Sequence, residues 1–262
     1  MTATAFEGRP SSTLDLSGTA PVPMSRLIRV ELRKLVDTRA SRWLLIAIAA
    51  ITLLIIVIFF LNADKSERTF SNFMGATATP QGFLLPVLGI LLVTGEWTQR
   101  TALVSFTLVP VRGRVIAAKV VAALLAGIAA IIVAMGLAAL ATVAGGASNA
   151  WDNIGLDDIG KFGILQVSGV LQGLAFGLLF LNSAAAIVTY FVLPIAFSIV
   201  ADLWHALHKA QPWIDLNTSQ QPLFRADHMS GTEWAQLATG TLIWVVLPFV
   251  VGVVRVLRAE VK

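Results

Sequence analysis

The segment from Gly155 to Phe162 has spacing that suggests nucleotide chemistry. A phosphate-binding loop ends in a Gly-Lys pair followed by Ser or Thr, whose hydroxyl holds magnesium. Lys161 is in place here, but Phe162 replaces the hydroxyl, and Asp157 and Asp158 would repel phosphate. We therefore predict that the chain binds no cofactor and has no ATP site of its own.

The three histidines are a second group whose spacing could bind a metal ion. His205 and His208 are three residues apart, and His228 follows in the same loop. They suggest either a metal site or three ordinary loop histidines, and we favour the second. The lack of cysteine excludes thiol catalysis and zinc–thiolate sites.

Few ionisable residues lie deep inside the long apolar segments of the chain. Glu96 and Asp202 lie close to the ends of such segments. Proton relays and ion pathways need such groups within the membrane. This pattern argues against a proton-coupled pump and an intramembrane protease, and no catalytic residue is expected. Any transport would have to draw its energy from another source.

The composition indicates the class of protein to which this chain belongs. The chain has 262 residues, of which 56% are hydrophobic and 13% charged, whereas soluble domains have about 25% charged residues. Its mean hydropathy is +0.80. The apolar residues form blocks of about 20, the length that crosses a hydrocarbon core of about 30 Å. We predict an all-α polytopic membrane protein with about six spans, at residues 43–61, 75–97, 115–144, 162–181, 184–204 and 234–256.

The N-terminal region differs from these blocks. Residues 1–24 are polar and predict a disordered tail, which leaves residues 25–262 as the transmembrane domain. Residues 25–39 predict an amphipathic helix, with Arg29, Arg33 and Lys34 among its charged residues. A basic helix of this kind lies along a membrane surface. The alternative is a solvated leader to the first span.

The distribution of Lys and Arg predicts the orientation. With the N-terminus in the cytoplasm, cytoplasmic segments hold 14 of the 19 basic residues and external loops hold 5. The positive-inside rule therefore places both termini in the cytoplasm. The richness in Ala, Val, Leu and Gly suggests a bacterial gene.

A glycine row marks the fourth predicted span, with Gly169, Gly173 and Gly177 spaced by four. Such a stripe lets another helix backbone approach closely. Packing within the monomer and packing against another subunit are both open. The outer loop, residues 205–233, mixes apolar and polar residues and suggests a segment that dips back into the outer leaflet.

The cytoplasmic segment from residue 95 to 119 is the most informative. Glu96 and Arg100 have the spacing of an i,i+4 ion pair. An amphipathic stretch covers residues 101–109, Pro110 breaks it, and a basic cluster leads into the third span. An ordinary basic loop is the alternative.

This segment resembles that of permease subunits of type-2 ATP-binding-cassette exporters. In that family an acidic residue closes the second span, an X-Thr pair follows, and Pro, Arg and Lys come after an amphipathic helix. The residues at those places here are Glu96, Thr101, Pro110, Arg112, Arg114 and Lys119, while Arg100 stands where many members have glycine. The resemblance extends over most of the chain, from Glu31 through Arg42 to the six-span layout and the ending Arg255-Val-Leu-Arg258.

The resemblance implies a non-catalytic subunit of the bacterial plasma membrane that works as a dimer, with an identical copy or a second permease. Two separate ATPase subunits would bind ATP and magnesium. The seven residues at and around the family positions (Glu96, Arg100, Thr101, Pro110, Arg112, Arg114 and Lys119) would couple to the ATPase together with the N-terminal helix, and the outer loop would form a re-entrant element near the exit of the path. The lipid bilayer is the other expected partner, and nucleic acid is not expected.

Two other classes of protein are alternatives to an exporter subunit. One is a membrane interaction or immunity protein without transport. The other is a membrane enzyme, which the scarcity of buried acid–base groups disfavours. A stable partner ATPase would separate the first of these from the exporter.

Overall fold

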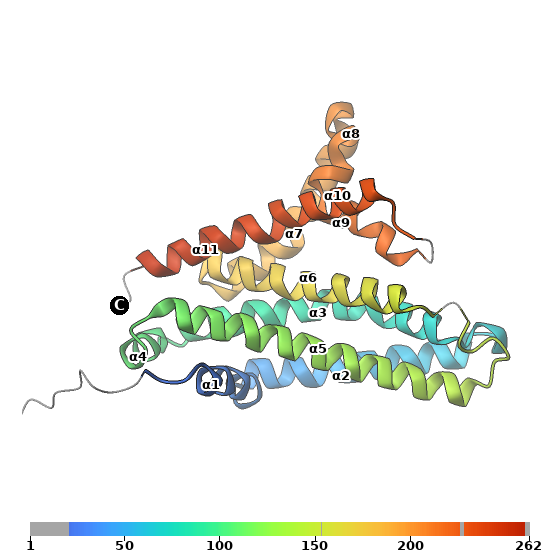
Figure 1. Cartoon of the computed structure of the whole chain (residues 1–262), viewed down its shortest axis with the longest axis horizontal. Helices are drawn as coiled ribbons and strands as arrows, with labels where there is room; N and C mark the ends of the chain where they lie inside the picture. The colour runs from blue at the N-terminus through green and yellow to red at the C-terminus, as the bar shows by residue number, and fades with distance from the viewer. Residues whose placement is uncertain (1–20, 153, 226–227, 260–262) are drawn as a thin grey trace, which may run out of the picture.

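The computed structural model describes residues 21–152, 154–225 and 228–259, and these residues are largely helical with no strand, which confirms the all-α prediction (Figure 1). In chain order the elements are α1 (Met24–Asp37), α2 (Arg39–Asn62), η1 (Lys65–Glu67), α3 (Phe70–Thr98), α4 (Ala102–Leu108), α5 (Arg112–Gly145), α6 (Leu156–Phe180), α7 (Ser183–Leu203), α8 (His205–Ile214), α9 (Leu216–Gln220), η2 (Gln221–Phe224), α10 (Gly231–Thr241), η3 (Leu242–Val246) and α11 (Leu247–Arg258). The predicted tail, residues 1–24, falls largely outside the described residues.

Six helices are long and apolar enough to cross a membrane: α2, α3, α5, α6, α7 and the continuous run α10–η3–α11. The chain is thus a polytopic membrane protein. The largest difference from the predicted limits is at α6, which begins at Leu156 rather than at residue 162. The reason is local, because Asp158 Oδ2 accepts the Gly155 N–H at 3.0 Å and so caps an earlier helix start.

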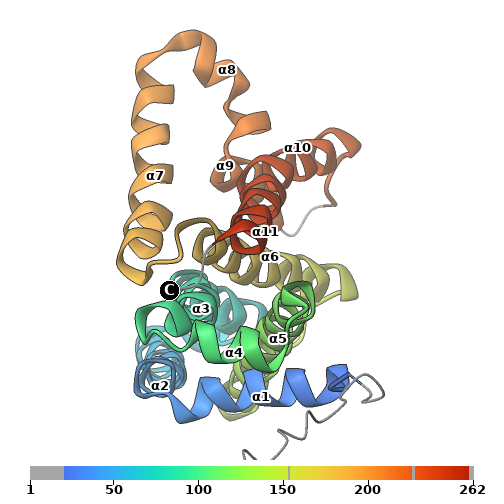
Figure 2. The same cartoon turned by 90° about the vertical axis from the view of Figure 1, so that its left-hand side faces the viewer.

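The spans form layers (Figure 1). Helices α3 and α6 lie between α2 and α5 on one side and α11 on the other, and they are the most buried spans. Helix α1 crosses the end of the bundle at which α11 also ends, and α7 leads away from the other helices to α8 (Figure 2). Helix α7 is the least buried span, so most of its apolar surface is uncovered.

The glycine row settles one open question, because it packs α6 against α3 within the monomer. A Cβ atom on Gly173 would lie 2.0 Å from the Pro86 carbonyl oxygen, and one on Gly177 would lie 3.1 Å from the Ile90 carbonyl oxygen. A Cβ on Gly169 would meet the Pro86 ring at 3.3 Å. The two backbones therefore touch only because these residues lack side chains.

Pro86 also explains a contact between α3 and α7. A proline within a helix has no N–H to give the carbonyl four residues earlier, which here belongs to Gly82. The Tyr190 hydroxyl of α7 lies 3.5 Å from that carbonyl oxygen and donates to it. A neighbouring helix thus supplies a long hydrogen bond to the group that the proline leaves free.

The segment between α7 and α10 is mostly helical rather than an open loop. Asp215 caps α9, and Ser230 with Glu233 forms a capping box at α10. The segment folds back on the bundle, where Gln220 Nε2 donates to Ser168 Oγ of α6 at 2.8 Å and Trp244 Nε1 donates to the Ile214 carbonyl at 2.7 Å.

Candidate coupling site

Four charged side chains from three helices close a ring at the end of the bundle that carries α1 and α4. Glu31 and Lys34 come from α1, Glu96 from the last turn of α3, and Lys119 from the second turn of α5. Lys119 Nζ lies 2.8 Å from Glu31 Oε2 and 3.3 Å from Glu96 Oε1. Lys34 Nζ lies 2.7 Å from Glu31 Oε1 and also pairs with Glu96. The charges alternate around the ring and sum to zero.

The ring is buried, with only 4% of Glu31, 7% of Glu96 and 5% of Lys119 exposed. Buried charges are tolerated only when they are paired and hydrogen-bonded. Both conditions hold, since Lys119 Nζ also donates to the Leu92 carbonyl at 3.0 Å and Ser105 Oγ of α4 donates to Glu96 Oε1 at 3.1 Å. The ring therefore connects four helices, α1, α3, α4 and α5, which Figure 2 shows together at this end.

Lys34 is the most accessible member of the ring, and its charge state follows from its neighbours. Burial by itself would lower the pKa of Lys34, but the carboxylates of Glu31 and Glu96 outweigh burial and raise that pKa above its ordinary value. A raised lysine pKa means that its stabilising contribution is complete below the ordinary pKa and is lost only as the pH rises through the raised value. The ring therefore keeps this positive charge throughout the neutral range.

The predicted ion pair between Glu96 and Arg100 is wrong, because α3 ends between them. Helix α3 ends at Thr98 and Arg100 has a φ of 58°, in the left-handed region. The Thr101 N–H donates to the Glu96 carbonyl at 2.9 Å and the Arg100 N–H to the Trp97 carbonyl at 3.2 Å, which is a Schellman motif. Arg100 thus occupies the position where glycine is most favoured, and its side chain is exposed while Glu96 pairs with lysines.

The basic cluster after Pro110 binds the two ends of the described chain. Arg112 Nη1 donates to the Val256 carbonyl at 2.8 Å and to the Ala259 carbonyl at 2.7 Å, at the end of α11. Arg114 donates to the Val22 carbonyl ahead of α1. Both arginines therefore have structural contacts within the chain, in addition to the role in coupling that the sequence suggested.

Helix α4 turns an apolar surface away from the bundle. Leu103, Val104 and Leu108 are 47%, 57% and 72% exposed, although α4 is outside the six candidate spans. Beside it lies a cavity of about 320 Å³, whose lining includes Val104, Ser105 and Glu96. An exposed apolar surface of this kind marks a contact with another protein or with the membrane.

Of the ring residues, Glu31 was not singled out from the sequence as a site residue. The available signal was an acid three residues before Lys34 on a mainly basic helix. Arg29 and Arg33, predicted on the same helix, are exposed and lie outside the ring. The sequence could not show that Glu31 reaches α5, because that contact joins residues 88 positions apart.

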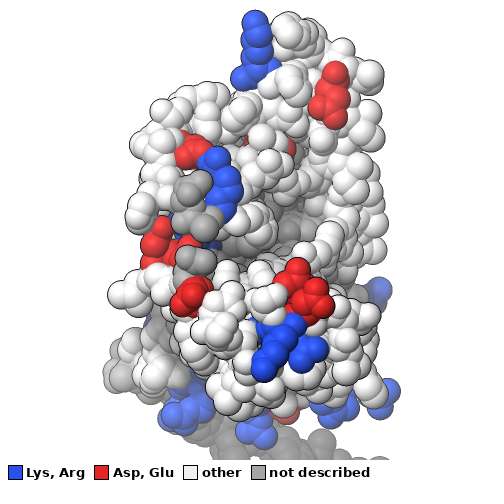
Figure 3. All heavy atoms as spheres, turned by 90° about the vertical axis from the view of Figure 1, so that its right-hand side faces the viewer, with Lys and Arg blue, Asp and Glu red and all other residues white. Residues whose placement is uncertain are grey.

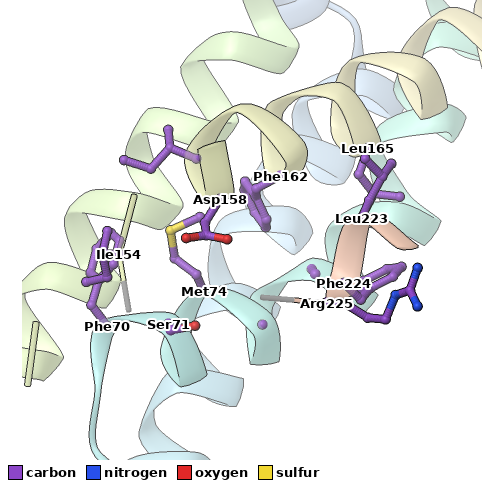
Figure 4. A pocket seen from close by; sticks show the side chains of 13 residues that line it. Phe70, Ser71, Met74, Ile154, Asp158, Phe162, Leu165, Leu223, Phe224 and Arg225 are labelled. Atoms are coloured by element: carbon purple, nitrogen blue, oxygen red, sulfur yellow. The ribbon is translucent and has the colours of Figure 1, made fainter. Parts of the chain in front are cut away.

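The opposite end of the molecule carries charges of both signs around a hollow (Figure 3). A separate cavity of about 180 Å³ lies there between α3, α6 and η2, lined by Met74, Phe162 and Phe224 together with Asp158 and Arg225 (Figure 4). Its two charged groups are already engaged, since Asp158 caps α6 and Arg225 pairs with Glu233.

The same end contains the residues that resembled a phosphate-binding loop and the loop histidines. Lys161 is buried and pairs with Asp157 at 2.8 Å, so acidic side chains occupy the start of α6. His228 Nδ1 lies 3.4 Å from Asp157 and His208 Nδ1 lies 3.6 Å from Asp202. Within the described residues no group of three His, Cys, Asp or Glu side chains could hold a metal ion.

Comparison with known proteins assigns the chain to no family. No family model matches it, and no curated protein matches it. Its function therefore has to be inferred from its own residues.

Proposed function

We propose that this chain is the membrane-spanning subunit of an ATP-driven exporter in a bacterial plasma membrane. The observation that carries the proposal is the junction at α4, where an exposed apolar helix is hydrogen-bonded to a buried ring of charges. A separate ATPase docks on α4 and binds the ATP and magnesium. The resemblance of residues 96–119 to exporter permeases supports the same assignment.

The contacts at α4 connect a docked ATPase mechanically to the membrane spans. A displacement of α4 acts on Glu96 through Ser105 and through the tight turn at Arg100. Glu96 is paired with Lys34 of α1 and Lys119 of α5, so α1, α3 and α5 are displaced together. ATP-driven motion at one surface then reaches three helices without any charge moving through the bilayer.

The other half of the exporter covers α7. This span leaves most of its apolar surface free, including Val192, Ile195 and Ile199, which are 55%, 61% and 57% exposed. A second permease subunit packs in this region, and the segment α8–η2 lies near the exit of the path at the opposite end from α4.

Orientation is the first test. We expect α1 and α4 in the cytoplasm, as the excess of Lys and Arg at that end favours. The chain has no cysteine, so single cysteines can be placed at exposed positions, Ser66 and Ser148 at the far end and Thr107 in α4. In intact cells an impermeant thiol reagent should label Ser66→Cys and Ser148→Cys but not Thr107→Cys, which should react only after the membrane is opened. Labelling of Thr107→Cys in intact cells would reverse the orientation.

Docking at α4 is the second test. We expect the tagged chain to co-purify from its native membrane with an ATP-hydrolysing subunit. Burial of a leucine side chain is worth about 1.5–3 kcal/mol, so Leu103→Ser with Leu108→Ser should lower the recovered ATPase by about tenfold or more. The matched control is Leu156→Ser, a leucine 89% exposed at the far end.

The docking test has two negative results, and they have different meanings. If the unmodified chain never recovers an ATPase, the exporter is excluded and a non-transporting interaction protein is the better hypothesis. If the double variant recovers as much ATPase as the control, α4 is not the docking surface.

A further inference from the structure

An apolar groove lies on the outer surface of the bundle beside α1. It has a volume of about 350 Å³ and lies between α1, α2 and α5. Leu32 and Val36 of α1 line one end, Ala49 lines the α2 side, and Ala129 and Val133 line the α5 side. Residues three and four apart share a helix face, so the alanines of α5 form a row of small side chains. The space above this row forms the groove.

The groove offers contact with hydrocarbon rather than with a polar ligand. Its polar lining residues are Thr52 and Gln81, which are 2% and 1% exposed. The side-chain oxygen of Gln81, Oε1, already accepts a hydrogen bond from Gln166 Nε2 at 2.7 Å. Thr52 is 13 residues along α2 from its first residue, or about 20 Å at the helical rise, which is the depth of acyl chains rather than of headgroups.

Positively charged side chains of α1 lie beside the groove. Arg26, Arg29 and Arg33 follow one another at spacings of three and four, so they form a row on α1, and all three are exposed. Helical spacing puts this row next to Leu32, on the side of α1 away from Glu31. Arg33 pairs with Asp37 but its side chain stays 80% exposed, and the described residues give Arg26 and Arg29 no acidic partner.

We propose that the groove holds an acyl chain of an anionic phospholipid whose headgroup binds Arg26, Arg29 and Arg33. The lipid belongs to the leaflet at the α1 end of the molecule. Basic residues at a membrane surface attract anionic lipids, and the groove fixes the position of one of them. This site does not depend on an ATPase partner.

The site also reaches the charged ring. Leu35 lines the groove, is only 3% exposed, and follows Lys34 of the ring in α1. A bound acyl chain covers the groove side of α1, so it holds α1 against α5 and keeps Glu31 at Lys119. An anionic lipid therefore stabilises the same helix arrangement that the ring stabilises.

The test compares phosphatidylglycerol with phosphatidylcholine of identical chains, titrated onto the delipidated full chain and counted by native mass spectrometry. The unmodified chain should retain the first lipid about tenfold more strongly than the second. Arg26→Gln, Arg29→Gln and Arg33→Gln combined should remove the preference, whereas Arg258→Gln, an exposed arginine at the same end, should keep it. Ala129→Phe should lower retention of both lipids, and Ala50→Phe, an exposed alanine outside the groove lining, should not.

Three results would overturn the proposal. They are equal retention of the two lipids by the unmodified chain, an unchanged preference in the triple variant, and unchanged retention in Ala129→Phe. A complex whose mass fits a second copy of the chain, lost on Ala129→Phe, would assign the groove to a protein contact instead.

Discussion

Gly173→Ala is expected to disrupt the bundle, although it adds one methyl group. The new Cβ would lie 2.0, 2.6 and 2.7 Å from the carbonyl oxygen, carbonyl carbon and Cα of Pro86. All three are backbone atoms of α3, so no side chain can move aside and α6 has to shift as a whole. Overpacking a tight core costs about 1–3 kcal/mol and occasionally more, and contact with rigid backbone puts this site at the upper end. We expect a lower melting temperature in detergent and a smaller yield of monodisperse protein.

Gly163→Ala is the matched control because it is the same change on the same helix. A Cβ at Gly163 meets no atom within 4 Å. Replacing glycine by alanine inside a helix favours the folded state by about 0.5–1 kcal/mol when there is room, so Gly163→Ala should melt at or above the unmodified temperature. Equal melting temperatures for Gly173→Ala and Gly163→Ala would mean that α3 and α6 do not meet at this face.

The spans could be predicted from the sequence because the bilayer imposes one strong requirement on each. A helix that crosses it needs about 20 apolar residues, and this pattern is local. The limits of α6 were less accurate, since Asp157 and Asp158 interrupt the apolar pattern yet extend the helix through capping and pairing. The direction of α7 had no signal in the sequence, because an apolar span has the same pattern whether it packs against the bundle or leaves it.

The candidate site was predictable in its parts but not in its connections. Glu96 and Lys119 stood out because they flank a segment with family-like spacing, whereas their pairing with Glu31 is a tertiary contact. The expected pair of Glu96 with Arg100 assumed that the helix continues for four more residues. Helix α3 stops at Thr98, and a left-handed residue then redirects the chain. Spacing rules for helices hold only inside a helix, so the same rule that suggested the pair fails at its end.

Lys119→Met is expected to have the largest effect of any change in the ring. It leaves Glu31 and Glu96 both buried with Lys34 as their single counter-charge. Removing one partner of a buried ion pair costs about 3–5 kcal/mol, because the other charge stays buried without compensation. We expect a large fall in melting temperature in detergent, and little change for Lys209→Met, which removes an exposed lysine at the far end.

A second variant distinguishes charge imbalance from loss of packing. Glu31→Gln combined with Lys119→Met leaves one carboxylate, Glu96, facing one ammonium, Lys34, so the remaining charges again sum to zero. Residues in one network show interaction energies of about 0.5–3 kcal/mol in double-mutant cycles. The double variant should therefore be more stable than Lys119→Met alone, even though it carries one more change. If the two losses simply add, the four charges do not act as a unit, and the ring does not pass a displacement of α4 to α1, α3 and α5 together.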